Sequence, residues 1–192
     1  MRTRCYNDRE VNRMKRSEIK KAQDRAYKMF VRAGIALTQT ERANIEVADF
    51  GLGELEKTGL EIVTYVNTDR VCAKELVLFP NQVCPQHRHP TVQGCPGKEE
   101  TFRCRMGTVY VYVPGEETKN RAVEPPQFGA YSVFHEIILK SGDQYTLVPD
   151  TWHWFAAGPE GAIVSEFSTT STDEADIFLD DRILRIPKIE ED

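Results

Sequence analysis

Residues 86–113 read QHRHPTVQGCPGKEETFRCRMGTVYVYV, and this stretch decides the fold. Its second half holds two runs, 100–105 and 108–113, that are rich in Val, Tyr, Phe and Thr and are separated by Gly107. Such short runs between turn-forming residues are typical of antiparallel strands. Its first half places the imidazoles of His87 and His89 on one face of an extended segment, because side chains alternate along extended backbone.

Similar runs occur on both sides of this stretch. Further strands are predicted at 60–66, 72–79, 134–139, 144–148, 153–157 and 162–167, and a long surface loop is predicted at 116–130. Short strands with turn signals and no intervening helices predict a mainly β protein whose sheet closes into an antiparallel β-barrel or jelly roll.

The N-terminal part has a helical pattern instead. Apolar residues recur at helical spacing over 17–33, with Ser17 as the N-cap and Gly34 as the C-terminal stop. Thr38 and Glu41 predict a capping box for a second, shorter helix. We therefore expect a single domain in three parts: a flexible basic tail (1–16), a helical segment packed on the barrel (17–56), and the barrel with its C-terminal extension (57–192).

The composition limits the classes of partner. The 192 residues suit one domain, and 40% of them are hydrophobic, which is enough for a core. A net charge of −5 gives no general case for nucleic acid or for an anionic membrane surface. No run reaches the roughly 18 apolar residues of a membrane span. The five cysteines include no C-x-x-C pair and follow no secretory leader, so we expect a reduced protein in the cytoplasm.

Three of the four histidines fall into one pattern with a carboxylate. His87 and His89 precede Glu100, which begins a run with apolar alternate residues, and His153 begins a later run. Three imidazoles and one carboxylate suit manganese, iron, cobalt, nickel or zinc and leave coordination positions open for chemistry. The alternatives are exposed histidines without a metal, a packed aromatic role for His153, and Glu99 instead of Glu100 as the ligand.

The spacing of these residues resembles the two sequence motifs of cupins, which match 86–107 and 142–153. One departure is the gap of ten residues between His89 and Glu100, which is longer than in many cupins. Longer phrases resemble bacterial D-lyxose isomerases of the cupin type over residues 33–182. They are YVNTDRVCAKELVLFPNQVCPQHRHP, GKEETFRCRMGTVYVYV and VPDTWHWFAAGPEGAIVSEFSTTSTDEADIF.

This resemblance implies a homodimeric, Mn²⁺-dependent aldose–ketose isomerase. Its expected reaction converts D-lyxose to D-xylulose, and also D-mannose to D-fructose, through a metal-stabilised enediol or enediolate. Co²⁺, Zn²⁺, Ni²⁺ and Fe²⁺ are the alternative ions. Three rival functions stay open: a cupin-type phosphosugar isomerase, a metal oxygenase, and a non-catalytic sugar-binding cupin.

Two residues are predicted to carry the proton chemistry. Glu166 lies on an apolar strand face, where burying a carboxylate is costly unless the group is paired, and we expect it to move the proton between the two sugar carbons. The matching position in the resembling family lies in the active site. The alternative is a scaffold ion pair with Lys or Arg. Lys98 shares the face of Glu100 and would reach a substrate oxygen, unless it is an ordinary surface lysine.

Four further residues are predicted to line the sugar pocket. They are Phe102, Lys74, Trp152 and His135. Aromatic faces pack well against the C–H surface of a sugar, and the lysine and histidine offer hydrogen bonds to its hydroxyl groups. The alternative for the aromatic residues and for the histidine is an ordinary place in the barrel core.

Overall fold

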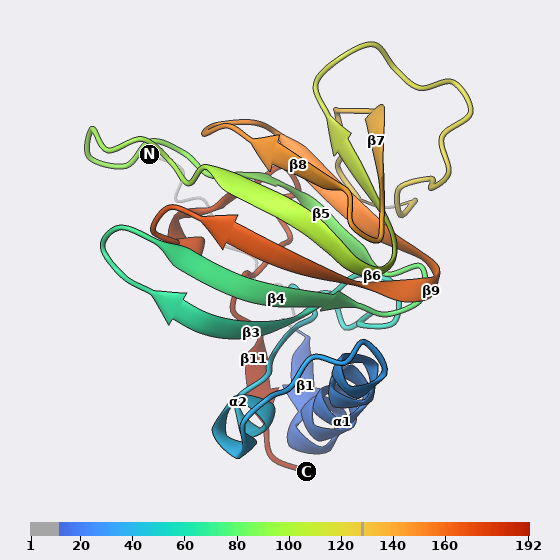
Figure 1. Ribbon diagram of the computed structural model, residues 1–192, viewed down its shortest axis with the longest axis vertical. Helices are drawn as coiled ribbons and strands as arrows, with labels where there is room; N and C mark the ends of the chain where they lie inside the picture. Colours follow the sequence, from blue (N-terminus) through green and yellow to red (C-terminus); the bar gives the residue numbers. More distant parts are fainter. Residues whose placement is uncertain (1–11, 128) are drawn as a thin grey trace, which may run out of the picture.

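The computed structural model describes residues 12–127 and 129–192, and it is mainly β-structure (Figure 1). Two helices precede the barrel, α1 (Arg16–Arg32) and α2 (Gln39–Ala43), and a 3₁₀ helix, η1 (Asp173–Ala175), follows it. The barrel strands are β2 (Glu46–Ala48), β3 (Leu60–Asn67), β4 (Cys72–Leu78), β5 (Val83–Arg88), β6 (Glu100–Val113), β7 (His135–Lys140), β8 (Gln144–Leu147), β9 (His153–Ser168) and β10 (Ile177–Phe178). A separate parallel pair joins β1 (Arg13–Lys15) to β11 (Lys188–Glu190).

The barrel is an antiparallel sheet that curls around strand β9. One path of neighbouring strands runs β10-β5-β9-β4-β3-β2, and β6 joins β7, β8 and β9. Strand β9 therefore pairs with β4, β5 and β6 and holds the sheet together. This arrangement confirms the mainly β, cupin-like barrel that the sequence predicts.

Strands β6 and β9 are longer than the sequence predicts. The runs 100–105 and 108–113 are one strand, and so are 153–157 and 162–167. Gly107 was expected to lie in a turn, but it and Gly161 lie at irregularities of the β6–β9 pairing, where the strands bend without ending. Their φ angles are +78° and +74°, and a Cβ on Gly107 would lie 2.1 Å from the Gly161 carbonyl oxygen.

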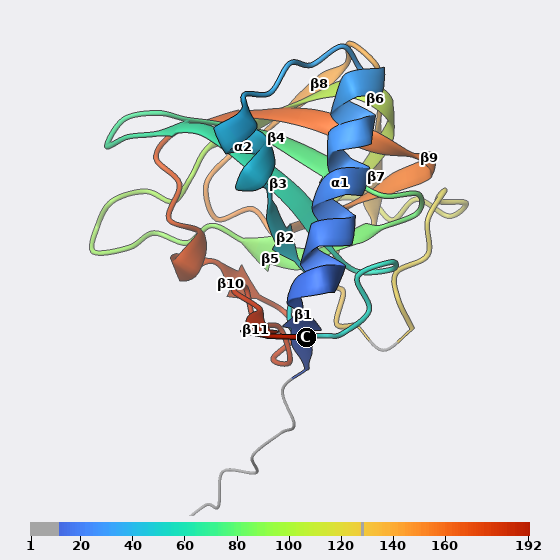
Figure 2. The same cartoon turned by 90° about the horizontal axis from the view of Figure 1, so that it is seen from below.

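Helix α1 covers the outer face of the sheet (Figure 2). Its buried face is formed by Ala22, Ala26, Met29 and Phe30. These side chains belong to one apolar cluster with Val63, Val77 and Ile163 of β3, β4 and β9. A second apolar cluster, which includes Phe102, Phe155 and Leu76, fills the barrel interior. The sheet is thus buried on both faces where the helix crosses it.

The helix ends follow the sequence with one exception. The capping box of Thr38 and Glu41 is confirmed, and α1 ends at Arg32, just before Gly34 with φ +70°. The prediction of Ser17 as the N-cap is wrong, because α1 begins at Arg16 and Lys15 is the N-cap residue. The Glu18 carboxylate accepts a hydrogen bond from the Lys15 amide, whereas the Ser17 hydroxyl donates to Asp192.

The predicted N-terminal tail and the predicted loop 116–130 both include residues that the structure does not describe. Of the predicted flexible tail 1–16, residues 1–11 lie outside the described residues, and the remainder forms β1 and the start of α1. The described residues of the predicted loop 116–130 contain no helix or strand. Among the described residues, no helix is both long and apolar enough to cross a membrane.

Candidate metal centre and active site

The four predicted metal ligands come from three strand ends at one mouth of the barrel. His87 lies in β5 and His89 directly follows that strand, while Glu100 and His153 are the first residues of β6 and β9. His87 and His153 are cross-strand partners in the β5–β9 ladder. All four residues are buried, with exposed fractions of 7% or less. The structure therefore brings together the complete ligand set that the sequence predicts.

The ring nitrogens of the three histidines converge. One ligand nitrogen from each of His87, His89 and His153 lies within 4.8 Å of the other two. Oε1 of Glu100 lies 3.1 Å from Nε2 of His89 and 3.1 Å from Nε2 of His153. Nε2 of His153 is buried and has no hydrogen-bond partner in the described structure. A buried nitrogen without a partner, facing a carboxylate and two imidazoles, fits a divalent cation.

The opposite nitrogen of each ring is held by an oxygen atom. Nδ1 of His87 lies 2.8 Å from the Pro85 carbonyl oxygen, and Nδ1 of His153 lies 2.9 Å from that of Thr151. Nδ1 of His89 lies 2.6 Å from Oδ1 of Asp176. Because each Nδ1–H donates to an oxygen, the lone pair of each Nε2 is left for a metal, which is the usual arrangement of ligating histidines.

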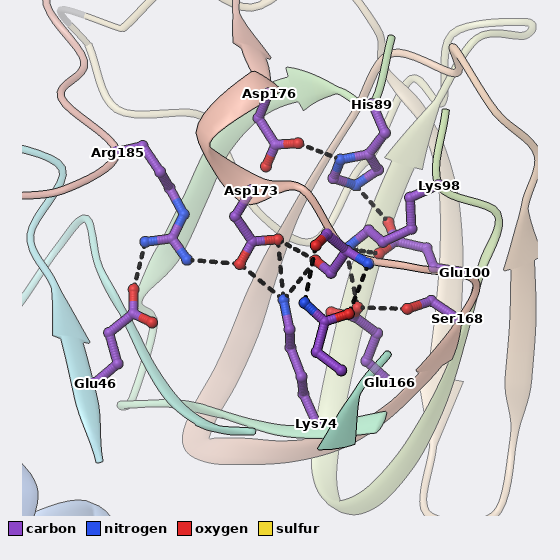
Figure 3. A network of polar contacts seen from close by, with 12 residues as sticks. Glu46, Lys74, His89, Lys98, Glu100, Glu166, Ser168, Asp173, Asp176 and Arg185 are labelled. Atoms are coloured by element: carbon purple, nitrogen blue, oxygen red, sulfur yellow. Dashed lines mark hydrogen bonds and ion pairs between the residues drawn. The ribbon is translucent and has the colours of Figure 1, made fainter. Parts of the chain in front are cut away.

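The predicted catalytic residues are joined to the ligands by an ion-pair chain (Figure 3). The ammonium group of Lys98 lies 2.7 Å from Oε2 of Glu100 and 2.9 Å from Oε1 of Glu166. The hydroxyl of Ser168 also donates to Oε1 of Glu166, at 3.1 Å. In the described structure Oε2 of Glu166 has no hydrogen bond, so one carboxylate oxygen is held and the other is free.

Burial and neighbouring charges shift the pKa values of Lys98, Glu100 and His89. Burial lowers the pKa of Lys98, but the carboxylates of Glu100 and Glu166 outweigh this and hold that pKa well above its usual range. Lys98 is therefore a cation at neutral pH. Burial raises the pKa of Glu100, but Lys98 and His89 hold it well below its usual range. The pKa of His89 is lowered by burial, and the carboxylates of Glu100 and Asp176 raise it to about 9.

The C-terminal segment covers the cavity. Lys74 on β4 donates to Asp173 at 2.7 Å, and Arg185 donates to the same carboxylate at 3.0 Å (Figure 3). Arg185 also pairs with Glu46 on β2. The pKa of Asp173 is raised by burial but held below its usual range by Lys74, Lys98 and Arg185. The remaining cavity at the metal centre has a volume of about 30 Å³.

Two of the four predicted pocket residues line this cavity and two do not. Phe102 and Lys74 line it. Trp152 does not, because it directly precedes the inward-facing His153 and packs in a separate cluster with Tyr112 and Trp154. His135 does not, because β7 pairs it with Val113, at the opposite end of β6 from Glu100. The structure therefore does not bring Trp152 and His135 to the cavity at the metal centre.

The sequence interpretation missed the contribution of residues 173–185. The side chains of this segment that line the cavity are Asp173, Asp176, Phe178 and Arg185. The ring of Phe178 stacks on His87 with a centroid distance of 5.3 Å. These residues carry no periodic pattern, so nothing in the sequence signals their place at the site. Glu99, the rival of Glu100, is exposed.

Comparison with known proteins identifies the family. The family model described as D-lyxose isomerase matches residues 39–192. The chain belongs to the D-lyxose isomerase family. Its sequence is 61% identical to that of the D-lyxose/D-mannose isomerase of Thermosediminibacter oceani, over 93% of this chain and 99% of that protein. It is 59% identical to the D-lyxose ketol-isomerase of Cohnella laeviribosi, over 93% of this chain and the whole of that protein. As a member of this family, the chain is an isomerase.

Solved structures of L-ribose isomerases share the fold. The L-ribose isomerase of Acinetobacter sp. DL28 superposes with a TM-score of 0.72 at 15% identity, over 93% of this chain and 98% of that one. The L-ribose isomerase of Cellulomonas parahominis gives a TM-score of 0.72 at 14% identity, over 93% and 99%. At this identity the likeness supports the cupin-like architecture alone.

Proposed function

We propose that the protein is a metal-dependent aldose–ketose isomerase that interconverts D-lyxose and D-xylulose, with D-mannose and D-fructose as a second pair. The observation that carries the proposal is the position of Glu166 and Lys98 beside a cluster of three histidines and a glutamate in one cavity. The names of the relatives supply the sugar, since two of them are called D-lyxose ketol-isomerases.

The proposed metal is Mn²⁺, held by His87, His89, Glu100 and His153. Imidazole and carboxylate ligands also suit Co²⁺, Zn²⁺, Ni²⁺ and Fe²⁺, so the identity of the ion is part of the proposal. When bound, such an ion acts as a Lewis acid that polarises the sugar carbonyl and makes the neighbouring C–H more acidic.

Glu166 is the proposed proton shuttle. Oε1 is fixed by Lys98 and Ser168, which leaves Oε2 to take the proton from C2 of the aldose and return it to C1, while the hydroxyl proton on O2 passes to O1. Lys98 is a buried cation, so it would stabilise negative charge that develops on the substrate oxygens. Phe102 lines the same cavity and excludes water from the exchange site.

The balance of charges favours a neutral sugar over a phosphosugar. Three cationic side chains (Lys74, Lys98 and Arg185) and four carboxylates (Glu100, Glu166, Asp173 and Asp176) line the cavity. Each of the three cations already pairs with a carboxylate. A fourth basic residue that could serve a phosphate, Arg88, pairs with Asp150 and does not line the cavity. A phosphate needs donors that are not already paired with carboxylates, so the phosphosugar alternative is disfavoured.

The deciding experiment compares metals and sugars on one preparation. Protein treated with a chelator receives Mn²⁺ or one of the other ions, and ketose formation is followed from D-lyxose, D-mannose and glucose 6-phosphate. We expect Mn²⁺-dependent formation of D-xylulose, loss of activity in His153→Ala, and retention in the matched control His135→Ala. Turnover of glucose 6-phosphate alone would favour the phosphosugar isomerase. Binding of metal and sugar without turnover would favour a sugar-binding cupin.

Two further expectations stay predictions, one from the resemblance and one from the cysteine pattern. They are the homodimer and the location in the cytoplasm. Sedimentation at several protein concentrations measures the first, and a single species of monomer mass at all of them would contradict it.

A further inference from the structure

Residues 173–178 reach two of the proposed metal ligands from outside the barrel strands that carry them. The segment crosses the mouth of the barrel after β9 and pairs with β5 through the short strand β10 (Figure 2). Ile177 is opposite Arg88 and Phe178 is opposite His87. In an antiparallel pair this register continues to Asp176 opposite His89, which brings the carboxylate to the imidazole.

The contact of Asp176 with His89 differs from those of the other two histidines. Backbone carbonyl groups hold Nδ1 of His87 and His153, at 2.8 and 2.9 Å. A carboxylate holds Nδ1 of His89, at 2.6 Å. A carboxylate is the stronger acceptor and carries a full charge, so it makes the imidazole a better electron donor to a cation at Nε2.

The backbone around Asp176 is fixed on both sides. Its amide donates to the Asp173 carbonyl oxygen at 3.2 Å, and the Leu179 amide donates to the Gln86 carbonyl oxygen at 3.0 Å. The Asp176 side chain is 8% exposed, so the bond to His89 is shielded from water. Such a shielded, charged hydrogen bond holds the ring in one orientation and one tautomer.

We propose that Asp176 is a positioning residue of the metal centre, which orients His89 and strengthens its binding to the metal ion. The inference rests on the proposed metal-dependent function. It also assigns the C-terminal segment a part in metal binding, because Asp176 reaches His89 only while β10 is paired with β5. The alternative is a purely structural role, in which the bond only holds the segment on the barrel. The test must distinguish this role from a role in metal binding.

The test measures Mn²⁺ affinity, not activity. Wild type and Asp176→Asn are stripped with a chelator and titrated with Mn²⁺ in competition with a fluorescent chelator. Asn keeps the shape and one acceptor oxygen but loses the charge, and loss of such an outer partner costs about 10–100-fold in metal affinity. We expect Asp176→Asn to bind Mn²⁺ about tenfold or more weakly, and Asp176→Glu to restore part of the loss.

Asp180→Asn is the matched control. Asp180 lies in the same segment, is 8% exposed and pairs with Arg182, and it touches none of the four ligands. We expect its Mn²⁺ affinity to equal that of wild type within about twofold, the usual scatter for a site that is not coupled. Melting temperatures without metal report how far each substitution destabilises the fold itself.

The results of the Mn²⁺ titrations distinguish a role in metal binding from a structural role. Wild-type affinity in Asp176→Asn would overturn the inference, and so would equal weakening in Asp176→Asn and Asp180→Asn, because both results would assign Asp176 a structural role only. If Asp176→Asn does not fold, the comparison of Asp176→Glu with Asp180→Asn decides in the same way. Wild-type protein that binds no Mn²⁺ or other divalent ion would instead reject the proposed function.

Discussion

Glu166→Gln is the substitution that tests the proposed chemistry most directly. The amide has the shape of the carboxylate but cannot take a proton. The structure allows the exchange at little cost, because Lys98 keeps its ion pair with Glu100 at 2.7 Å and the amide oxygen still accepts from Lys98 and Ser168. No hydrogen bond joins Glu166 to the three histidines in the described structure, so metal affinity is expected to stay unchanged.

The size of the effect follows from the role of the residue. A positioned general base contributes typically 10²–10⁴ in rate. At 1.36 kcal/mol for each factor of ten, its loss raises the activation barrier by roughly 3–5 kcal/mol. The rate of D-xylulose formation should therefore fall by at least about 100-fold, while the melting temperature and the Mn²⁺ content stay close to those of wild type.

The assay adds an isotope to the rate. Wild-type turnover in D₂O should place deuterium on the carbon that receives the proton, and Glu166→Gln should abolish both turnover and incorporation. Glu160→Gln, an exposed carboxylate on the same strand β9, is the control and should behave like wild type. Activity of Glu166→Gln within about tenfold of wild type would refute the reasoning. Wild-type turnover without incorporation of deuterium would indicate a hydride shift instead.

Three further predictions concern stability and access. Lys98→Met removes the cation from two buried carboxylates, Glu100 and Glu166. In a denaturant titration with chelator present, the free energy of unfolding should fall by about 3–5 kcal/mol. A loss below about 1 kcal/mol would contradict a stabilising role for these ion pairs. Burial raises the pKa of Glu61, which has no hydrogen-bond partner in the described structure, well above its usual 4.5. Folding therefore favours the protonated form of Glu61, and stability is lost as the pH rises from the usual pKa of 4.5 towards the raised pKa of the folded protein. Glu61→Gln should therefore melt at a higher temperature than wild type at neutral pH but not at acidic pH. Finally, a cavity of about 30 Å³ is too small for a pentose, so we expect residues 171–185 to move when the sugar binds. Amide exchange in this segment should change when D-lyxose is added to the Mn²⁺-loaded protein; exchange that D-lyxose leaves unchanged would contradict this.

The metal ligands could be predicted because their geometry is local. His87 and His89 share a face through the two-residue alternation of extended backbone, and the same alternation places Glu100 on the inner face with Phe102. The exposed fractions of Glu100 and Phe102 are both 1%, while Arg103 between Phe102 and Cys104 is exposed. Alternation needs no knowledge of the partner strand, so the sequence is sufficient for this part of the site.

The cover of the site could not be predicted because it depends on register. Strand β10 has two residues, which is too short to show any alternation, and its place beside β5 is set by contacts between segments far apart in the chain. Asp173 and Asp176 therefore look like ordinary polar residues of a solvated tail. Trp152 is adjacent to His153 in sequence but faces away from the cavity, and the place of His135 depends on the pairing of β7 with the far end of β6.

The sequence posed two alternatives for Glu166, a catalytic base or the partner of a cation, and the structure shows that these roles are compatible. Lys98 and Ser168 occupy Oε1 only. A carboxylate that is held at one oxygen keeps its orientation, and its second oxygen is available to a substrate. The ion pair is thus no argument against catalysis. It does mean that substitutions of Lys98 and of Glu166 should change different properties of the protein. Removing Lys98 leaves buried charges unpaired and lowers stability, whereas replacing Glu166 by Gln leaves Lys98 paired with Glu100 and lowers the rate.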